Sequence, residues 1–385
     1  MSPDPVTPEG RHPLRGIRVL DLGNYIAGPC TAVLLAEMGA DVIKVEPPVG
    51  DPFRQWEGTS LSPSFVAFNR GKRSVCLDLK QPEDLDRFRA LARTADVLVE
   101  NFRAGVTERL GVGPDDLREE NPRLIYCKIS GFGTSGPGVR MPAYDGVATG
   151  YSGLAGLLLD PEEPRLRGPA IADAVTGHSA AFQILAALWA REASGKGAHV
   201  EITMLGSVVH FLHSAVAKWC VDGVEEGADL RTRLSMAFAF TTGDDRALIV
   251  HLSSPVKFWE AFCQVTGRPE LLTDVRFAER AARVKNHEAL RREMEPVFRT
   301  GTRDEWLRRL QDGGIPCAPV NSVGEAVNDP LYTRLGLLDV VEHEGLGPLP
   351  SILPPAHWDG ETLGAVPRPP LLGEHTDEVL AGLAD

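Results

Sequence analysis

The chain has 385 residues, of which 43% are hydrophobic and 6% aromatic, and its formal net charge is −13. This acidic balance argues against nonspecific nucleic-acid binding, which needs a basic surface. No apolar run reaches the roughly 20 residues that span a bilayer, and the Pro-rich, polar start lacks an apolar signal core. We therefore expect a cytoplasmic protein that binds neither nucleic acid nor membrane, with residues 1–15 as a flexible leader.

The first half of the chain alternates between strand and helix patterns. Buried strands are predicted at residues 16–22, 41–46, 74–79, 96–100, 124–130 and 198–204, and helices at about 30–38, 82–93 and 174–193. Alternation of this kind predicts a parallel sheet with helices on both faces. Residues 16–217 are therefore assigned to a large Rossmann-like α/β domain.

The pattern changes after residue 217. Residues 218–234 are polar and irregular, which is typical of a linker. The segment MAFAFTTGDDRALIVHL predicts a β-hairpin about its Gly-Asp-Asp turn, and three helical segments follow it. Residues 235–313 are therefore predicted to form a smaller α+β domain. Residues 314–385 are Pro- and Gly-rich, and we expect them to be a second linker that returns to the large domain.

Asp173 stands at the start of the long apolar helix predicted at 174–193. We expect it to be the N-cap of that helix, because an Asp side chain can accept the free amide hydrogens of the first turn, a role worth about 1 kcal/mol. A helix N-terminus also favours an anion by about 0.3–1 kcal/mol, so a carboxylate at this position is helped to stay charged.

Several common functional motifs are matched only in part, and we do not assign them. The first strand–loop–helix–strand unit ends in Glu46 as in a dinucleotide-binding fold, but its loop reads G-N-Y-I-A-G-P and lacks the G-x-G-x-x-G glycines. Ser179 lies inside a predicted helix, which excludes a nucleophile elbow. His210 and His213 are three residues apart with no legible third ligand, and the six cysteines form no C-x-x-C pair. We expect no metal.

Basic residues cluster in two segments, NRGKRS at 69–74 and NFRAGVTERLG at 101–111. Both segments lie at strand ends: the first leads into the strand predicted at 74–79, and the second directly follows the strand predicted at 96–100. Because ligands of open α/β sheets bind at the carboxyl ends of strands, these cations are candidates for an anionic small ligand.

An ordered series of motifs resembles the class III CoA-transferases, the formyl-CoA and carnitine CoA-transferase family. The motifs are GIRVLDLGNYIAGPCTAVLLAEMGADVIKVE, NRGKRSVCLDLK, ADVLVENFRAGVTERLGVG, YDGVATGYSGL, ADAVTGHSAAFQILAALWAREASGKGAHVEITML, EWLRRLQDGGIPCAPVNSVGEAVNDP and PLLGEHTDEVL. The resemblance implies a large α/β domain joined by long linkers to a small domain, with two chains threaded into an interlocked homodimer.

The resemblance also implies an activity. It places the catalytic aspartate in a D-x-x-T-G segment, which here is Asp173 to Gly177. The implied reaction moves CoA from an acyl-CoA to a free carboxylic acid through an aspartyl anhydride and an aspartyl-CoA thioester, with no permanently bound cofactor. The chemistry agrees, because a carboxylate nucleophile can hold the acyl group and CoA in turn while one thioester is exchanged for another.

Matching to the family pattern also implies binding residues. Lys72, Arg73 and Arg109 are implied for the CoA phosphates, and Tyr144 is implied near the active site. The loop implied to line the pantetheine and thioester consists of Asn24, Tyr25, Ile26, Ala27 and Gly28.

The chain departs from formyl-CoA transferases in three ways. No glycine-rich loop lies between Met236 and Leu252, Pro47 replaces a basic residue, and Pro142 replaces a lysine. These departures argue against an enzyme specific for oxalate and formate, and the donor and acceptor acids stay unassigned.

Two alternatives remain open. One is an α-methylacyl-CoA racemase, which needs two bases, the second being a His directly before the Asp of a G-H-D segment. Here the segment reads Ala143-Tyr144-Asp145, and a tyrosine with a pKa near ~10 is a poor base at neutral pH. The other alternative is a CoA-binding protein without turnover.

Overall fold

The computed structural model describes residues 12–383 except 57, 59, 60, 161, 226, 254 and 344–346. The chain divides into two compact units. The first unit takes in residues up to 155, 165–213 and 330 onward, and the second takes in 156–164 and 214–329. Residues 1–11 of the expected leader lie outside the described residues, whereas Leu14 of that segment is buried in a core.

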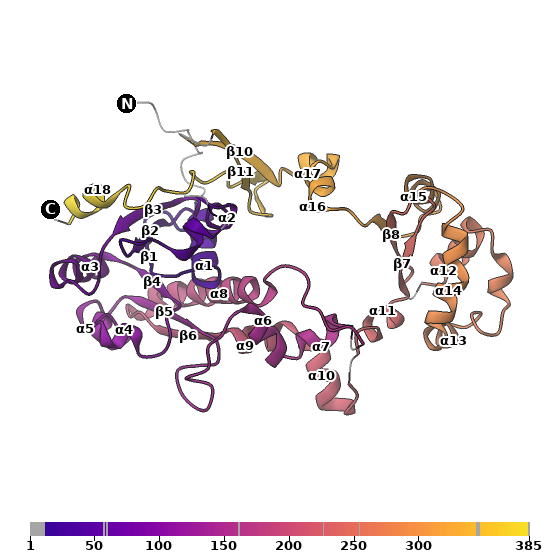
Figure 1. Cartoon of the computed structure of the whole chain (residues 1–385), viewed down its shortest axis with the longest axis horizontal. Helices are drawn as coiled ribbons and strands as arrows, with labels where there is room; N and C mark the ends of the chain where they lie inside the picture. Colours follow the sequence, from indigo (N-terminus) through magenta and orange to yellow (C-terminus); the bar gives the residue numbers. More distant parts are fainter. Residues whose placement is uncertain are drawn as a thin grey trace. The chain divides into compact units, whose positions relative to one another are not determined.

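The first unit is built on a six-stranded sheet, as the alternating pattern predicts (Figure 1). Its strands pair in parallel in the order β3-β2-β1-β4-β5-β6. They are β1 (Arg18–Asp21), β2 (Asp41–Glu46), β3 (Lys72–Cys76), β4 (Val97–Glu100), β5 (Ile125–Ser130) and β6 (His199–Thr203). This is the strand order of the Rossmann fold. The order in which the chain adds strands reverses between β1 and β4, so the connections after these two neighbouring strands run in opposite directions.

Helices cover both faces of this sheet. Successive strand residues point to opposite faces, so Val19 of β1 packs with α1 (Ala27–Glu37) and α8 (Ile171–Ser194), and Leu20 packs on the other side. The second face is covered by α3 (Pro82–Thr94), α5 (Pro114–Glu120) and α18 (Thr376–Ala381). By length and composition α8 is apolar enough to cross a membrane, but its buried residues belong to the core that it shares with α1.

The remaining elements of the first unit surround the sheet. The end of the chain returns to β3, where the His375 amide donates to the Ser74 carbonyl at 2.9 Å and α18 lies beside the strand (Figure 1). The other elements are a 3-10 turn (Pro52–Gln55), α2 (Pro63–Asn69), α4 (Val106–Arg109), α6 (Asp145–Tyr151), α9 (Met204–Phe211), α17 (Pro330–Leu335), β10 (Leu338–His343), β11 (Gly347–Ile352), β12 (His357–Trp358) and β13 (Glu361–Thr362). The short α7 (Leu154–Leu158) begins in the first unit and ends in the second.

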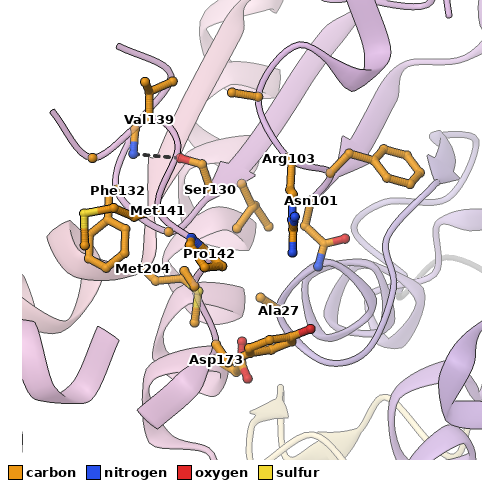
Figure 2. A pocket seen from close by; sticks show the side chains of 18 of the residues that line it. Ala27, Asn101, Arg103, Ser130, Phe132, Val139, Met141, Pro142, Asp173 and Met204 are labelled. Carbon is orange, nitrogen blue, oxygen red and sulfur yellow. Dashed lines mark hydrogen bonds between the residues drawn. The ribbon is translucent and has the colours of Figure 1, made fainter. Parts of the chain in front are cut away.

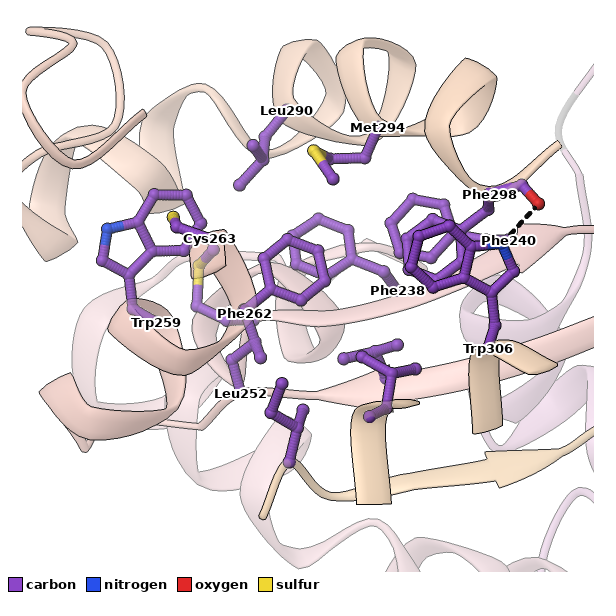
Figure 3. Close-up of a cluster of buried hydrophobic side chains, with 14 of the residues drawn as sticks. Phe238, Phe240, Leu252, Trp259, Phe262, Cys263, Leu290, Met294, Phe298 and Trp306 are labelled. Carbon is purple, nitrogen blue, oxygen red and sulfur yellow. Dashed lines mark hydrogen bonds between the residues drawn. The ribbon is translucent and has the colours of Figure 1, made fainter. Parts of the chain in front are cut away.

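The second unit has its own aromatic core. The predicted hairpin is present as antiparallel β7 (Ala237–Thr241) and β8 (Ala247–His251), and Phe240 of β7 stacks on Phe298 at 4.2 Å between ring centroids (Figure 3). The helices over this sheet are α12 (Val256–Val265), α13 (Arg280–Lys285), α14 (His287–Phe298) and α15 (Arg303–Asp312), with a 3-10 turn at Pro269–Leu272.

The structure differs from the expected boundaries of this unit. The segment 218–234, expected to be irregular, contains the end of α10 (His213–Asp222) and all of α11 (Leu230–Leu234). On the other side, β9 (Cys317–Pro319) pairs antiparallel with β8, so the small sheet continues beyond residue 313 into the segment expected to be a linker. The short α16 (Val323–Val327) follows β9.

Candidate active site

A cavity of about 460 Å³ lies at the carboxyl ends of the parallel strands (Figure 2). Its walls come from the loops that follow β1, β4 and β5, from Met204 directly after β6, and from Asp173 of α8. It therefore occupies the place where open α/β sheets bind ligands, next to the reversal between β1 and β4. The lining residues are 24–27, 101–104, 129–133, 138–144, 173 and 204.

Asp173 lies in the first turn of α8 and is not its N-cap. The helix begins at Ile171 with Ala170 as the N-cap residue, so Asp173 is the third helical residue. Its own amide, which the first helical turn leaves without an intrahelical acceptor, donates to Oδ1 of Asp145 at 3.2 Å. Asp145, 28 residues earlier and at the start of α6, thus supplies the acceptor that the sequence suggested Asp173 would provide.

Burial and a neighbouring carboxylate shift the acidity of Asp173. Burial raises the pKa of Asp173 and the charge of Asp145 raises it further, to about 7. Within the described residues, no side chain donates a hydrogen bond to the Asp173 carboxylate. The helix N-terminus alone, worth about 0.3–1 kcal/mol, therefore does not keep this group at its ordinary acidity. The carboxylate lies free in the cavity wall and titrates near neutral pH.

The Thr176-Gly177 pair beside Asp173 has a packing role. The Thr176 hydroxyl donates to the Ala172 carbonyl at 2.6 Å, inside the helix. Gly177 lies against α1, because a Cβ at this position would be 2.7 Å from Sγ of Cys30. Only glycine permits this approach, which brings the N-terminus of α1 beside the first turn of α8.

The loop after β1 lies in the cavity wall. Asn24, Tyr25, Ile26 and Ala27 all line the cavity, whereas Gly28 does not. A Cβ at Gly28 would be 2.9 Å from the Gly23 Cα, so this glycine is needed for close backbone packing.

Helix α1 begins at this loop, three residues before its expected start. The N–H groups of the first turn of a helix have no intrahelical partner. In the described structure the amides of Ile26, Ala27 and Gly28 have no other acceptor, so donors are available at the cavity wall.

Two aromatic residues join this wall. Tyr25 has a φ of 63°, a left-handed conformation that is uncommon for a bulky residue and costs of order 1–3 kcal/mol. Tyr144, directly before α6, is 62% exposed and meets the Tyr25 ring edge-on at 6.2 Å between centroids. Tyr144 therefore lies in the cavity wall with Asp173, as expected.

The three expected phosphate-binding cations are not brought together. Lys72 is 3% exposed, and its ammonium donates to Asp21 at 2.7 Å, to Asn69 at 2.9 Å and to the Pro29 carbonyl at 3.0 Å. Arg73 lies on the surface and pairs with Asp41 at 2.7 Å. Neither residue lines the cavity.

Arg109 has a different position. It is the last residue of α4, is exposed, and lies outside the cavity wall on the same connection that follows β4. Two further arginines line the cavity itself, Arg103 on that connection and Arg140 on the loop before α6. All three arginines are exposed and none has an ion-pair partner in the described part of the chain.

Sequence reasoning did not name Asn101, Arg140 or Asp145 as binding or catalytic residues, and it included Arg103 only among the clustered basic residues. Asn101 exchanges two hydrogen bonds of 2.9 Å with the backbone of Asn24 and so ties the β4 loop to the β1 loop. Its place directly after a predicted strand was a usable signal for Asn101. Asp145 carried no such signal, because its partner is distant in sequence.

Metal ligands are not assembled in the described structure. The His210 and His213 rings lie 4.4 Å apart between centroids on the outer side of α9 and the start of α10. Among the described residues, no group of three His, Cys, Asp or Glu side chains is placed to hold a metal ion.

The fold and the cavity define an α/β protein with a carboxylate in the wall of a cavity at the reversal point of a Rossmann-ordered sheet. Comparisons with known proteins give the family. The model of CoA-transferase family III matches residues 14–376, and the chain belongs to this family and is a class III CoA-transferase.

Relatives and solved structures resemble the chain along most of its length. Acetyl-CoA:oxalate CoA-transferase of Acetobacter aceti is 37% identical over 87% of each chain. Succinate–glutarate CoA-transferase of Agrobacterium fabrum is 34% identical over 98% of this chain and 97% of its own. The crystal structure of a CaiB/BaiF family protein from Brucella suis matches with a TM-score of 0.86 at 32% identity, covering 97% of this chain and all of that one.

The shifted acidity of Asp173 is directly measurable. Replacing Asp145→Asn removes the repulsion between two carboxylates, so we expect the pKa of Asp173 to fall from about 7 while burial still holds it above ~3.9. Carbon-13 NMR of labelled aspartates, assigned with Asp173→Asn, reports the titration. Glu201→Gln, an exposed carboxylate on β6, serves as the control and should leave this pKa unchanged. An equal pKa in wild type and Asp145→Asn would contradict the electrostatic coupling.

Proposed function

We propose that this enzyme transfers CoA between an acyl-CoA and a free carboxylic acid with Asp173 as the covalent nucleophile. The carrying observation is the Asp173 carboxylate, free of side-chain donors in the described structure, in the wall of the cavity at the carboxyl ends of the sheet. CoA transfer is the activity of the family, and relatives carry the names of transferases for oxalate, glutarate and mesaconate.

The proposed reaction balances without a metal, an electron carrier or a net proton. A carboxylate oxygen of Asp173 attacks the thioester carbonyl, the C–S bond breaks, and CoA thiolate leaves behind a mixed anhydride. The thiolate then attacks Cγ of Asp173 and displaces the donor acid as its carboxylate, which leaves an aspartyl-CoA thioester. The acceptor carboxylate attacks this thioester, and the two steps run in reverse to give the new acyl-CoA.

Backbone amides supply the electrostatic part of the proposal. Each step passes through a tetrahedral oxyanion, and preorganised N–H donors stabilise such charge strongly in a site that excludes water. The free amides of Ile26 and Ala27 lie in the same cavity wall as Asp173 and are the proposed donors.

A trapping experiment tests the nucleophile. On incubation with succinyl-CoA and hydroxylamine, the activated Asp173 carboxyl should become a hydroxamate, seen by mass spectrometry on the peptide that contains residues 165–195. Asp173→Asn should give no adduct and lower transfer to a panel of carboxylates by about 10⁴-fold or more, because the nucleophile is removed.

Ser179→Ala is the matched control on the same helix, since Ser179 lies two turns from Asp173 and outside this cavity. It should behave as wild type. Near-normal transfer by Asp173→Asn, or an adduct on another residue, would end the proposed mechanism.

We further propose that Arg109, with Arg103 and Arg140, binds the phosphates of CoA. All three are exposed arginines without ion-pair partners in the described residues, at or near the cavity, whereas Lys72 and Arg73 are engaged by acidic partners. Arginine suits phosphate because its guanidinium donates two parallel hydrogen bonds.

Truncation of Arg109 should therefore weaken acyl-CoA binding. A hydrogen bond to a charged group contributes about 1.5–3 kcal/mol, so Arg109→Ala should raise the KM for succinyl-CoA by roughly 10- to 100-fold with kcat almost unchanged. Arg93→Ala, a surface arginine paired with Glu120, is the control. An unchanged KM would show that Arg109 lies outside the CoA site.

We also propose that a second copy of the chain covers the outer face of α8, in the interlocked homodimer that the family resemblance implies. Phe182 and Trp189 are 68% and 82% exposed, and their spacing of seven residues places them on one side of the helix. Phe211 of α9, 55% exposed, adds to the apolar surface.

Sedimentation equilibrium tests the dimer. Wild type should have twice the chain mass of 41.6 kDa, and Trp189→Glu should shift the population toward monomer, because a buried charge without a partner is costly. Trp358→Glu, an exposed tryptophan on β12, should leave the mass unchanged. A monomeric wild type would contradict the proposal.

A further inference from the structure

In the loop between β1 and α1, the backbone groups of Gly23 and Asn24 form hydrogen bonds with side chains and, among the described residues, not with other backbone groups. The Gly23 amide donates to Oδ1 of Asp21 at 2.8 Å, and the Gly23 carbonyl accepts from the Lys44 ammonium at 2.8 Å. The next residue, Asn24, has both backbone groups bound by Asn101. Side chains from β1, β2 and the end of β4 therefore satisfy consecutive backbone groups that a loop normally exposes to water.

The same arrangement reaches Tyr25. Its amide lies 3.5 Å from Oδ1 of Asp51, and that oxygen also accepts the Phe53 amide at 2.8 Å. The other carboxylate oxygen of Asp51 is 2.9 Å from the Lys44 ammonium. One cation thus connects the Gly23 carbonyl on one side of Asn24 with the anchor of Tyr25 on the other.

These charged groups are sealed from water. Lys44 and Lys72 alternate with Asp21 and Asp51 in a neutral cluster whose side chains are at most 1% exposed, and Asp21 pairs with Lys72 at 2.7 Å and with Lys44 at 3.7 Å. Buried ion clusters of this kind are often no more stabilising than well-packed apolar residues of the same volume. Stability alone therefore gives no reason for an ammonium under the loop, whereas its hydrogen bond to the Gly23 carbonyl does.

The conformation of this loop determines where the free amides of Ile26 and Ala27 lie in the cavity wall. Tyr25 adopts its left-handed φ of 63° only because its surroundings fix it, and the chain enters α1 directly afterwards at Ala27. Release of the Gly23 carbonyl or the Tyr25 amide would let Tyr25 relax and would move the free amides of Ile26 and Ala27. Displacements of about 1 Å in such donors are sufficient to cost 10²-fold in rate.

We propose that Lys44 is a positioning residue for CoA transfer: its buried ammonium, holding the Gly23 carbonyl and the Asp51 carboxylate, keeps the Gly23–Ile26 loop in the conformation that aims the α1 amides at the Asp173 reaction centre. The inference rests on the proposed function. It assigns Lys44 no contact with substrate, since Lys44 does not line the cavity.

The test measures the rate of hydroxylamine labelling of Asp173 as a function of succinyl-CoA concentration. Lys44→Met should lower the maximal labelling rate by about 10- to 100-fold, with less than about a 3-fold change in the half-saturating concentration, because acyl-CoA still binds while the donors are misplaced. Lys44→Met also leaves Asp51 buried without its cation, so the variant loses stability as well.

A double variant separates positioning from stability. Lys44→Met with Asp51→Asn removes both charges, which should restore much of the denaturation midpoint while labelling stays slow. Arg191→Met is the matched control: it removes a buried cation paired with Asp96 at 2.9 Å, at the opposite end of the same sheet. It should lower the midpoint and leave the maximal labelling rate per folded molecule unchanged.

The outcomes separate the positioning role of Lys44 from the Asp173 mechanism. Wild-type labelling rates in the folded Lys44→Met protein, or a rate that recovers in step with the midpoint in the double variant, would overturn the positioning role and leave the Asp173 mechanism intact. No labelling of the wild-type enzyme would overturn the Asp173 mechanism and this inference with it.

Discussion

The reversal of strand order between β1 and β4 is the constraint on which the site depends. Because β1 pairs with β2 on one side and with β4 on the other, the chain leaves the two central strands in opposite directions and opens a space between their loops. Asn101 spans that space with two hydrogen bonds to Asn24. Loop positions, amide donors and cavity all follow from this pairing, and α8 then contributes the carboxylate.

The contact between α1 and α8 determines the chemistry available in that space. At Gly177 the two helices approach until the Cys30 side chain touches the glycine backbone, so two helix N-termini meet at one wall. One of them carries a carboxylate whose pKa burial and Asp145 raise to about 7, and the other offers unpaired amides. A carboxylate with a raised pKa beside free amide donors is the combination on which the proposed formation and release of acyl bonds depends.

The local sequence pattern predicted the secondary-structure elements whose formation depends on residues adjacent in the chain. Alternating strands and helices were sufficient for the parallel sheet, and the strand at 41–46 was predicted with its observed bounds. The start of α1 was missed because Gly28 and Pro29 read as loop residues, although proline is tolerated in the first turn of a helix. The motif resemblance pointed to Asp173 and to the 24–28 loop, and the structure places Asp173 and residues 24–27 in the cavity wall.

The site features that could not be predicted from the sequence depend on pairing between residues distant in the chain. Lys72 and Arg73 stand next to each other in a basic segment, but alternation along β3 directs one ammonium inward to Asp21, 51 residues away, and the other side chain out to the surface. Asp145 replaces Asp173 as the acceptor at the helix start across 28 residues. Pairings of this kind have no local signature, so charge near a strand end was an incomplete guide to ligand contacts.

The return of the C-terminal segment to the first unit has a consequence for the order in which the enzyme is completed. Arg54, whose guanidinium pairs with Glu46 beside the Asp51 anchor, also donates to the Pro370 carbonyl at 3.1 Å. A ribosome synthesises residues 214–329 before it reaches this carbonyl, so the second unit has all of its chain while the first still lacks its closing segment. The Pro370 carbonyl therefore reaches Arg54, beside the Asp51 anchor, only after the residues of the second unit have been synthesised.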